Sequence, residues 1–95
     1  MAAYVIAEIR IKDPEKYEEY RLMVPATLDM HGGRYLVRGG ETRLLEGEPQ
    51  PNRLAVLEFE SAERAVEWYE SEDYRQLIPI RQAASEFRLV LVKGV

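Results

Sequence analysis

The sequence contains no cysteine and only one histidine, His31. The absence of cysteine excludes disulfide bonds, thiolate metal sites and cysteine nucleophiles. One histidine leaves only carboxylate-rich metal sites, and no spacing of Asp and Glu residues suggests one. The chain also lacks a Gly-rich phosphate-binding motif and any run near the roughly 20 apolar residues of a membrane span. We therefore expect no metal, no cofactor and no membrane partner.

Positive charge is scarce, because 13 Lys and Arg residues face 17 Asp and Glu residues for a net charge of −4. Nucleic-acid binding needs an excess of basic residues on one face, so we expect none here. The amino terminus has no basic segment before Glu8, which argues against a signal peptide and predicts a cytoplasmic protein. A length of 95 residues predicts a single domain over residues 1–95.

The hydrophobic periodicity predicts four strands and two helical regions. The expected strands are 4–11, 34–38, 54–59 and 87–92, the helices are 14–31 and 62–70, and further helical turns follow over 71–85. Asp13 and Pro14 are a good helix start, whereas Pro25 is expected to kink or split the first helix. The order β-α-β-β-α-β predicts a ferredoxin-like α+β fold, with an antiparallel sheet in the order 4-1-3-2 and helices on one face. A hairpin loop is expected over 47–52.

Strand side chains alternate between the two faces of a sheet. One set is almost wholly apolar and suits the face under the helices. The other set mixes charges with the aliphatic residues Ile6, Leu36, Val56, Val90 and Val92. A solvated face is one interpretation, but a monomer seldom exposes such an apolar patch. We therefore expect a homodimer in which two sheets face each other about a two-fold axis.

Three residues are candidates for acid–base or anion chemistry. Strict alternation places Arg38 and Glu58 on the same face of a hairpin, where a carboxylate beside a guanidinium can orient a substrate or act as a base. A structural ion pair is the alternative. His31 lies at the end of the first helix, where it is either an acid–base group or a cap. The predicted catalytic residues are thus His31, Arg38 and Glu58.

A second group of residues is a candidate for ligand binding. Trp68, Tyr69 and Tyr74, with Arg81 downstream, are placed to roof a pocket between helices and sheet for a flat apolar ligand, although plain packing is the alternative for Tyr69. Tyr20 faces the core by spacing, and its hydroxyl needs a partner if it is buried. The predicted core face of the second helix consists of Ala62, Ala65, Val66 and Tyr69, so Trp68 lies one residue off it. The predicted ligand-binding residues are Tyr20, Arg34, Trp68, Tyr74 and Arg81.

Several short segments, in order along nearly the whole chain, carry a family resemblance. They are Ala3–Glu8, Asp13-Pro14 with Tyr17 and Tyr20, Val24–Thr27, Gly32–Gly40, Leu57–Phe59, Trp68-Tyr69, Ser71, Tyr74 and Pro79–Arg81. With these segments the chain resembles the bacterial domain-of-unknown-function family 1330, within the dimeric α+β barrel superfamily. The resemblance implies a ferredoxin-like protomer whose sheet packs on that of a partner. Wider relatives include cofactor-free monooxygenases, lactone isomerases, haem-dependent enzymes and small stress-associated dimers, and kinship of that breadth transfers no function.

Two hypotheses about function follow from different classes. The first is a cofactor-free enzyme, performing proton transfer, isomerisation or monooxygenation on a small aromatic or carbonyl compound. Arg38 would hold an anionic oxygen while Glu58 or His31 moves the proton. The second is a non-catalytic dimeric ligand-binding or stress-associated protein, in which the same charges only set the register of the interface.

Overall fold

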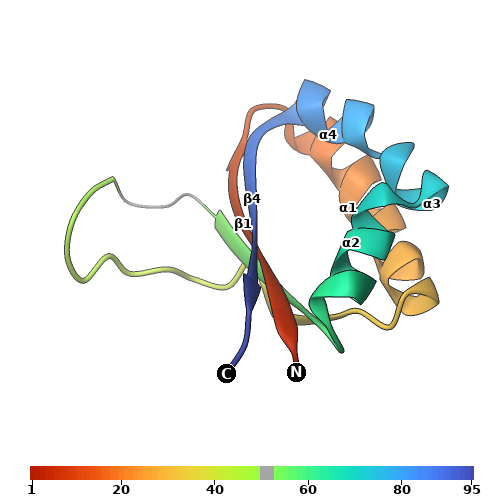
Figure 1. Ribbon diagram of the computed structural model, residues 1–95. Coiled ribbons are helices and arrows are strands. Elements are labelled where there is room, and N and C mark those ends of the chain that lie inside the picture. The colour runs from red at the N-terminus through yellow and green to blue at the C-terminus, as the bar shows by residue number, and fades with distance from the viewer. Residues whose placement is uncertain (50–52) are drawn as a thin grey trace.

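The computed structural model describes residues 1–49 and 53–95. Its elements are β1 (Ala3–Ile11), α1 (Pro14–Met30), β2 (Arg34–Arg38), β3 (Arg53–Phe59), α2 (Ala62–Glu70), α3 (Glu72–Arg75), α4 (Ile78–Ala84) and β4 (Ser85–Lys93). The strands form one antiparallel sheet in the order β2-β3-β1-β4. The helices lie together on one side of this sheet (Figure 1). The predicted ferredoxin-like α+β fold and strand order are confirmed.

Helix α1 begins as the sequence predicts but does not break at its proline. The Asp13 side chain accepts a hydrogen bond from the Lys16 backbone N–H at 3.2 Å, and α1 then runs without interruption through Pro25. Pro25 has no N–H, so the carbonyl of Arg21, four residues earlier, lacks its helical donor. Nη2 of Arg38 donates a hydrogen bond to that carbonyl oxygen at 2.7 Å. The Arg38 side chain, from β2, thus supplies the hydrogen bond that the Arg21 carbonyl lacks because residue 25 is a proline.

Strand β2 contains an irregularity that decides where Arg38 lies. The pairing register with β3 shifts by one residue between Tyr35 and Val37, which places Arg38 opposite Ala55. A bulge of this kind reverses the alternation of the residues that follow it. Arg38 therefore lies on the helix-covered face with Ala55. The prediction that Arg38 shares a face with Glu58 is wrong for this reason.

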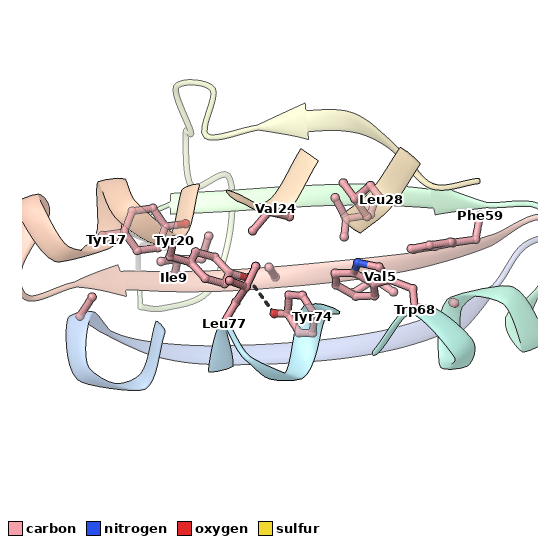
Figure 2. Close-up of a cluster of buried hydrophobic side chains, with 14 residues drawn as sticks. Val5, Ile9, Tyr17, Tyr20, Val24, Leu28, Phe59, Trp68, Tyr74 and Leu77 are labelled. Atoms are coloured by element: carbon pink, nitrogen blue, oxygen red, sulfur yellow. Dashed lines mark hydrogen bonds between the residues drawn. The ribbon is translucent and has the colours of Figure 1, made fainter. Parts of the chain in front are cut away.

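The core lies between the helices and the sheet and is rich in aromatic rings (Figure 2). Its largest fully buried side chains are Trp68, Tyr74, Phe59, Leu28 and Val24. Helix α2 turns Ala65 and Trp68 inward, while Val66 and Tyr69 remain more than 40% exposed. The predicted core face of this helix is therefore confirmed at Ala65 but wrong at Val66 and Tyr69, because Trp68 is buried in their place. Burial of the Trp68 indole is possible because its N–H donates to Thr27 Oγ1 at 3.0 Å.

The opposite face of the sheet, which we call the open face, carries no helix. Its apolar residues Val90 and Val92 are 40% and 44% exposed, and β2 adds the exposed Leu36 and Val37. The connection between β2 and β3 runs out on this side, away from the helices (Figure 1). It contains no strand over 41–49, and the rest of the predicted hairpin loop, 50–52, lies outside the described residues. Across the two described ranges, no helix has the length and apolar character needed to cross a bilayer.

Candidate functional site

A small cavity lies between α1 and the helix-covered face of the sheet. Its volume is about 30 Å³, which is room for about one or two water molecules. Its wall combines apolar side chains, among them Trp68 and Phe87, with the polar residues Tyr17, Tyr20, Arg21, Tyr35, Arg38 and Arg53. Among the described residues that line it, none is a carboxylate or a histidine. The polar chemistry of the cavity therefore comes from phenols and guanidinium groups.

Two of the three arginines at the mouth of the cavity form no ion pair in the described structure. Arg21 binds Glu18 through two hydrogen bonds of 2.8 and 2.7 Å, and this bonding lowers the pKa of the Glu18 carboxyl. Arg38 and Arg53 have no carboxylate within ion-pair distance among the described residues. Two surplus positive charges beside a low-dielectric wall favour the approach of an anion.

Aromatic rings hold these two guanidinium groups in place. The Arg38 guanidinium lies 4.4 Å from the centre of the Tyr35 ring, and that of Arg53 lies 5.8 Å from the centre of the Tyr17 ring. Cation–π contacts of this length orient a guanidinium without neutralising it. Burial raises the pKa of both phenols, so each stays neutral at physiological pH. The mouth therefore presents oriented positive charge over neutral rings.

A chain of buried hydrogen bonds ends at the cavity wall. Nη1 of Arg81 donates to the Tyr74 hydroxyl at 2.9 Å. That hydroxyl lies 2.7 Å from the hydroxyl of Tyr20, and Figure 2 shows this second contact. Tyr74 is fully buried and its hydroxyl has no third partner in the described structure. Either hydroxyl can be the donor of this bond, and the other hydroxyl then accepts it. Tyr20 also lines the cavity, so this pair of hydroxyl-bearing side chains reaches the cavity wall.

Burial and the nearby charge of Arg81 together determine the pKa values of Tyr20 and Tyr74. Arg81 is only 7% exposed, lies 4.7 Å from the centre of the Phe87 ring and leaves its Nε without a hydrogen-bond partner among the described residues. Burial raises the pKa of Tyr20 and of Tyr74, and the nearby Arg81 charge offsets part of each rise. Both phenols are therefore neutral hydrogen-bond donors at physiological pH and not bases.

The three predicted catalytic residues do not meet. Glu58 lies on the open face and accepts a hydrogen bond from Nε of Arg34 at 2.6 Å, so Arg34 takes the place predicted for Arg38. His31 caps α1, with its backbone N–H donating to the Leu28 carbonyl at 3.0 Å. Its Nε2 is buried without a described partner, and His31 does not line the cavity. The catalytic roles of these residues stay predictions that this geometry does not support.

The predicted ligand-binding residues are brought together more closely. Tyr20 and Trp68 line the cavity, while Tyr74 and Arg81 stand behind Tyr20. Arg34 is not among them, because it lies on the open face with Glu58. The residues that the sequence interpretation missed at this site are Tyr17, Arg21, Tyr35 and Arg53. Alternation along β3 would have placed Arg53 on the same face as Ala55, but nothing in the sequence indicates the path of α1 above it. No three potential metal ligands cluster anywhere in residues 1–49 or 53–95.

The sheet, its single helical layer and the cavity beneath α1 define a ferredoxin-like α+β protein. The model of the domain of unknown function DUF1330 matches residues 2–95, and the chain belongs to that family. No curated protein matches the sequence.

Solved structures share the fold at low sequence identity. A protein of unknown function from Rhodopseudomonas palustris is 20% identical, with a TM-score of 0.82 over 99% of this chain and 82% of its own. A dimeric ferredoxin-like protein of unknown function from Jannaschia sp. CCS1 is 10% identical, with a TM-score of 0.74 over 99% and 100% of the two chains. SnoaB, a cofactor-independent oxygenase from Streptomyces nogalater, is 11% identical, with a TM-score of 0.67 over 99% and 93%. At such identities the likeness concerns the fold.

Proposed function

We propose that this protein is a homodimer that binds a small anionic carbonyl or phenolic compound at the cavity beneath α1. The observation that carries the proposal is the pair of guanidinium groups, Arg38 and Arg53, at the cavity mouth without a carboxylate partner among the described residues. This concentration of positive charge occurs in a chain whose net charge is −4. An anion is the class of ligand that such a site attracts most strongly.

The shape of the site restricts the ligand further. The interior of about 30 Å³ admits no more than a small group, so the anionic part of the ligand stays at the mouth beside Arg38 and Arg53. Tyr20 lines the interior, and its phenolic hydroxyl is a hydrogen-bonding group that suits an oxygen of the ligand there. A carbonyl or hydroxyl oxygen one or two bonds from the anionic group fits both requirements. This describes a small keto or hydroxy acid, or a phenolate with a neighbouring oxygen.

Binding is favoured over catalysis by what lines the cavity. Proton transfer needs a base within hydrogen-bond reach of the substrate. The described wall offers neutral phenols and guanidinium groups, which stabilise an anion but do not accept a proton at neutral pH. The ligand-binding hypothesis therefore has the stronger support of the two. The cofactor-independent oxygenase among the structural neighbours supports only the view that this fold accommodates a small-molecule site.

The homodimer is supported by the open face of the sheet. Apolar side chains from all four strands are exposed or half-buried there, which a soluble monomer seldom tolerates over a contiguous patch. A two-fold contact between two such faces covers both patches at once. The dimeric neighbour from Jannaschia sp. CCS1 has the same fold.

Calorimetric titration with matched anionic and neutral probes tests the proposed site. We expect pyruvate and salicylate to bind, and acetone and salicylamide, which lack the anionic group, not to bind. Arg53→Gln removes one surplus charge and should weaken anion binding about tenfold or more. Arg38 is less suitable for this test because it also supports α1 at Pro25.

Two control variants separate the cavity from the open face and from general charge. Arg75→Gln removes a charge from α3, away from the lining residues, and should leave anion binding unchanged. Glu58→Gln should also leave it unchanged, because Glu58 pairs with Arg34 on the open face. Equal binding of the neutral probes, or full anion binding by Arg53→Gln, would refute the proposed site. Light scattering that gives the mass of one chain, 11.0 kDa, at all accessible concentrations would refute the homodimer.

A further inference from the structure

The connection between β2 and β3 projects from the open face. We call its described residues 40–49 the arm. The arm stands on the side of the sheet away from the helices (Figure 1). A hollow of about 590 Å³ lies between the arm and two open-face residues, Val37 and Leu54. Leu45, on the arm, is 84% exposed. An apolar side chain on a projecting segment, beside a hollow of this size, suits a contact with another polypeptide.

The arm is acidic. Its charged residues are Glu41, Arg43, Glu46 and Glu48, three negative charges and one positive, for a net charge of −2. None of these residues has an ion-pair partner in the described structure. A surface that meets the arm favourably should therefore be basic.

The edge strand β4 has a basic group of residues near one of its ends. Where β1 ends and β4 begins, the cations Arg10 and Lys12 share one carboxylate, Glu86, at 3.8 and 4.0 Å, and these three residues have a net charge of +1. The arm leaves the sheet at this same end, because β3 begins at Arg53, which pairs with Ile9 beside Arg10. We call Arg10, Lys12 and Glu86 the basic strip.

The direction of a two-fold axis between the sheets decides what each arm meets. An axis along the strands puts the β2 edge of one protomer over the β4 edge of its partner, with like ends together, so each arm meets the partner's basic strip. An axis across the strands puts each arm at the opposite end, over Arg34 and Glu58, whose charges cancel in a 2.6 Å pair. Charge complementarity favours the first arrangement.

We propose that the arm of each protomer clasps the β4 edge of a second copy of this chain, with its acidic residues against the basic strip and Leu45 on the partner's apolar open face. This proposal rests on the proposed homodimer and specifies its contact. The partner's β4 then fills the hollow beside the arm. Because β4 is an edge strand, its outer backbone hydrogen-bonding groups have no neighbouring strand within one protomer.

Charge reversal on each side of the contact tests the proposal. The dimer dissociation constant is measured by sedimentation velocity at low ionic strength for Glu46→Lys/Glu48→Lys, for Lys12→Glu and for the triple variant. Each one-sided change turns an attractive contact into a repulsive one, so we expect about a tenfold or greater rise in the constant. The triple variant restores opposite charges and should return to within about threefold of the wild type. Glu70→Lys, on α2, is the matched control and should have no effect.

The possible results separate this contact from the homodimer itself. A wild-type chain that remains monomeric refutes the homodimer and the clasp together. A dimer whose dissociation constant is unchanged in Glu46→Lys/Glu48→Lys refutes only the clasp, as does a triple variant as weak as its one-sided parents. A wild-type dimer that weakens when salt is raised, together with recovery in the triple variant, supports the clasp.

Discussion

The hydrogen bond between Arg38 and the Arg21 carbonyl predicts an energetic coupling between two residues that are distant in sequence. Arg38 supplies the donor that Pro25 cannot supply. Arg38→Ala should therefore leave the Arg21 carbonyl without a protein partner. In a Pro25→Ala background the new backbone N–H at position 25 can bond to that carbonyl. The same Arg38→Ala change should then cost much less.

The size of the coupling follows from the contacts of Arg38. Its bond to the carbonyl is charge-assisted but lies at an exposed side chain, so we take about 1–1.5 kcal/mol, the upper half of the range for ordinary hydrogen bonds. Its contact with the Tyr35 ring adds about 0.5 kcal/mol at an exposed site. Arg38→Ala should thus lower the free energy of unfolding by about 1.5–2 kcal/mol in the wild type, but by only about 0.5 kcal/mol in the Pro25→Ala background.

Urea unfolding followed by circular dichroism measures all four corners of this double-mutant cycle. Protein concentration must be the same throughout, because dissociation of a dimer makes apparent stability concentration-dependent. Arg53→Ala is the control, since Arg53 does not contact α1 near Pro25 and should cost the same in both backgrounds. An Arg38→Ala cost that is equal in the two backgrounds would show that the carbonyl bond has no energetic role and would refute the reasoning.

The buried hydroxyl chain gives two further predictions. Tyr74→Phe should cost about 2–4 kcal/mol and Tyr20→Phe about 1–2 kcal/mol, because only Tyr74 also accepts the charged bond from Arg81. Urea unfolding measures both, and equal costs would show that the bond from Arg81 to Tyr74 adds nothing to stability. Burial raises the folded-state pKa of both phenols above the ordinary 10.0, so their contribution to stability is complete below that pH and is lost as pH rises above it. The loss of stability between about pH 9 and pH 11 should therefore be smaller in Tyr20→Phe than in wild type, and an unchanged loss would argue against this cause.

Much of the fold was predictable because it depends on local patterns. The first strand, the Asp13 cap and the apolar spacing of Tyr17, Tyr20 and Val24 all appear in the structure where the sequence places them. The order of elements then leaves few topologies, since connections are short and crossovers right-handed. The core position of Trp68 was missed because its indole needs the Thr27 hydroxyl, a partner 41 residues away along the chain.

The candidate site was predictable only in part, because its geometry depends on one inserted residue. Regular alternation along β2 predicts that Arg38 and Glu58 share a face. The register shift after Tyr35 instead places Arg38 on the other face of the sheet. No local property of this segment shows where a bulge lies, since the pairing is set by the neighbouring strand. The effect of Pro25 was also out of reach of the sequence. The missing N–H predicts a break in the helix, and only the structure shows that Arg38 supplies the replacement donor.

The sequence by itself determined the ferredoxin-like topology and the apolar face beneath the helices, because both follow from periodicities of 2.0 and 3.6 residues. Only the tertiary structure decided the partners of the charged side chains. Arg38 lies at the cavity mouth and bonds to the Arg21 carbonyl. Glu58 pairs with Arg34 on the open face, and Arg81 donates to the buried hydroxyl of Tyr74. The physical reason is the distance along the chain over which each property is determined. Backbone periodicity is set within one element, whereas the partner of a charge or a buried hydroxyl comes from whichever element packs against it.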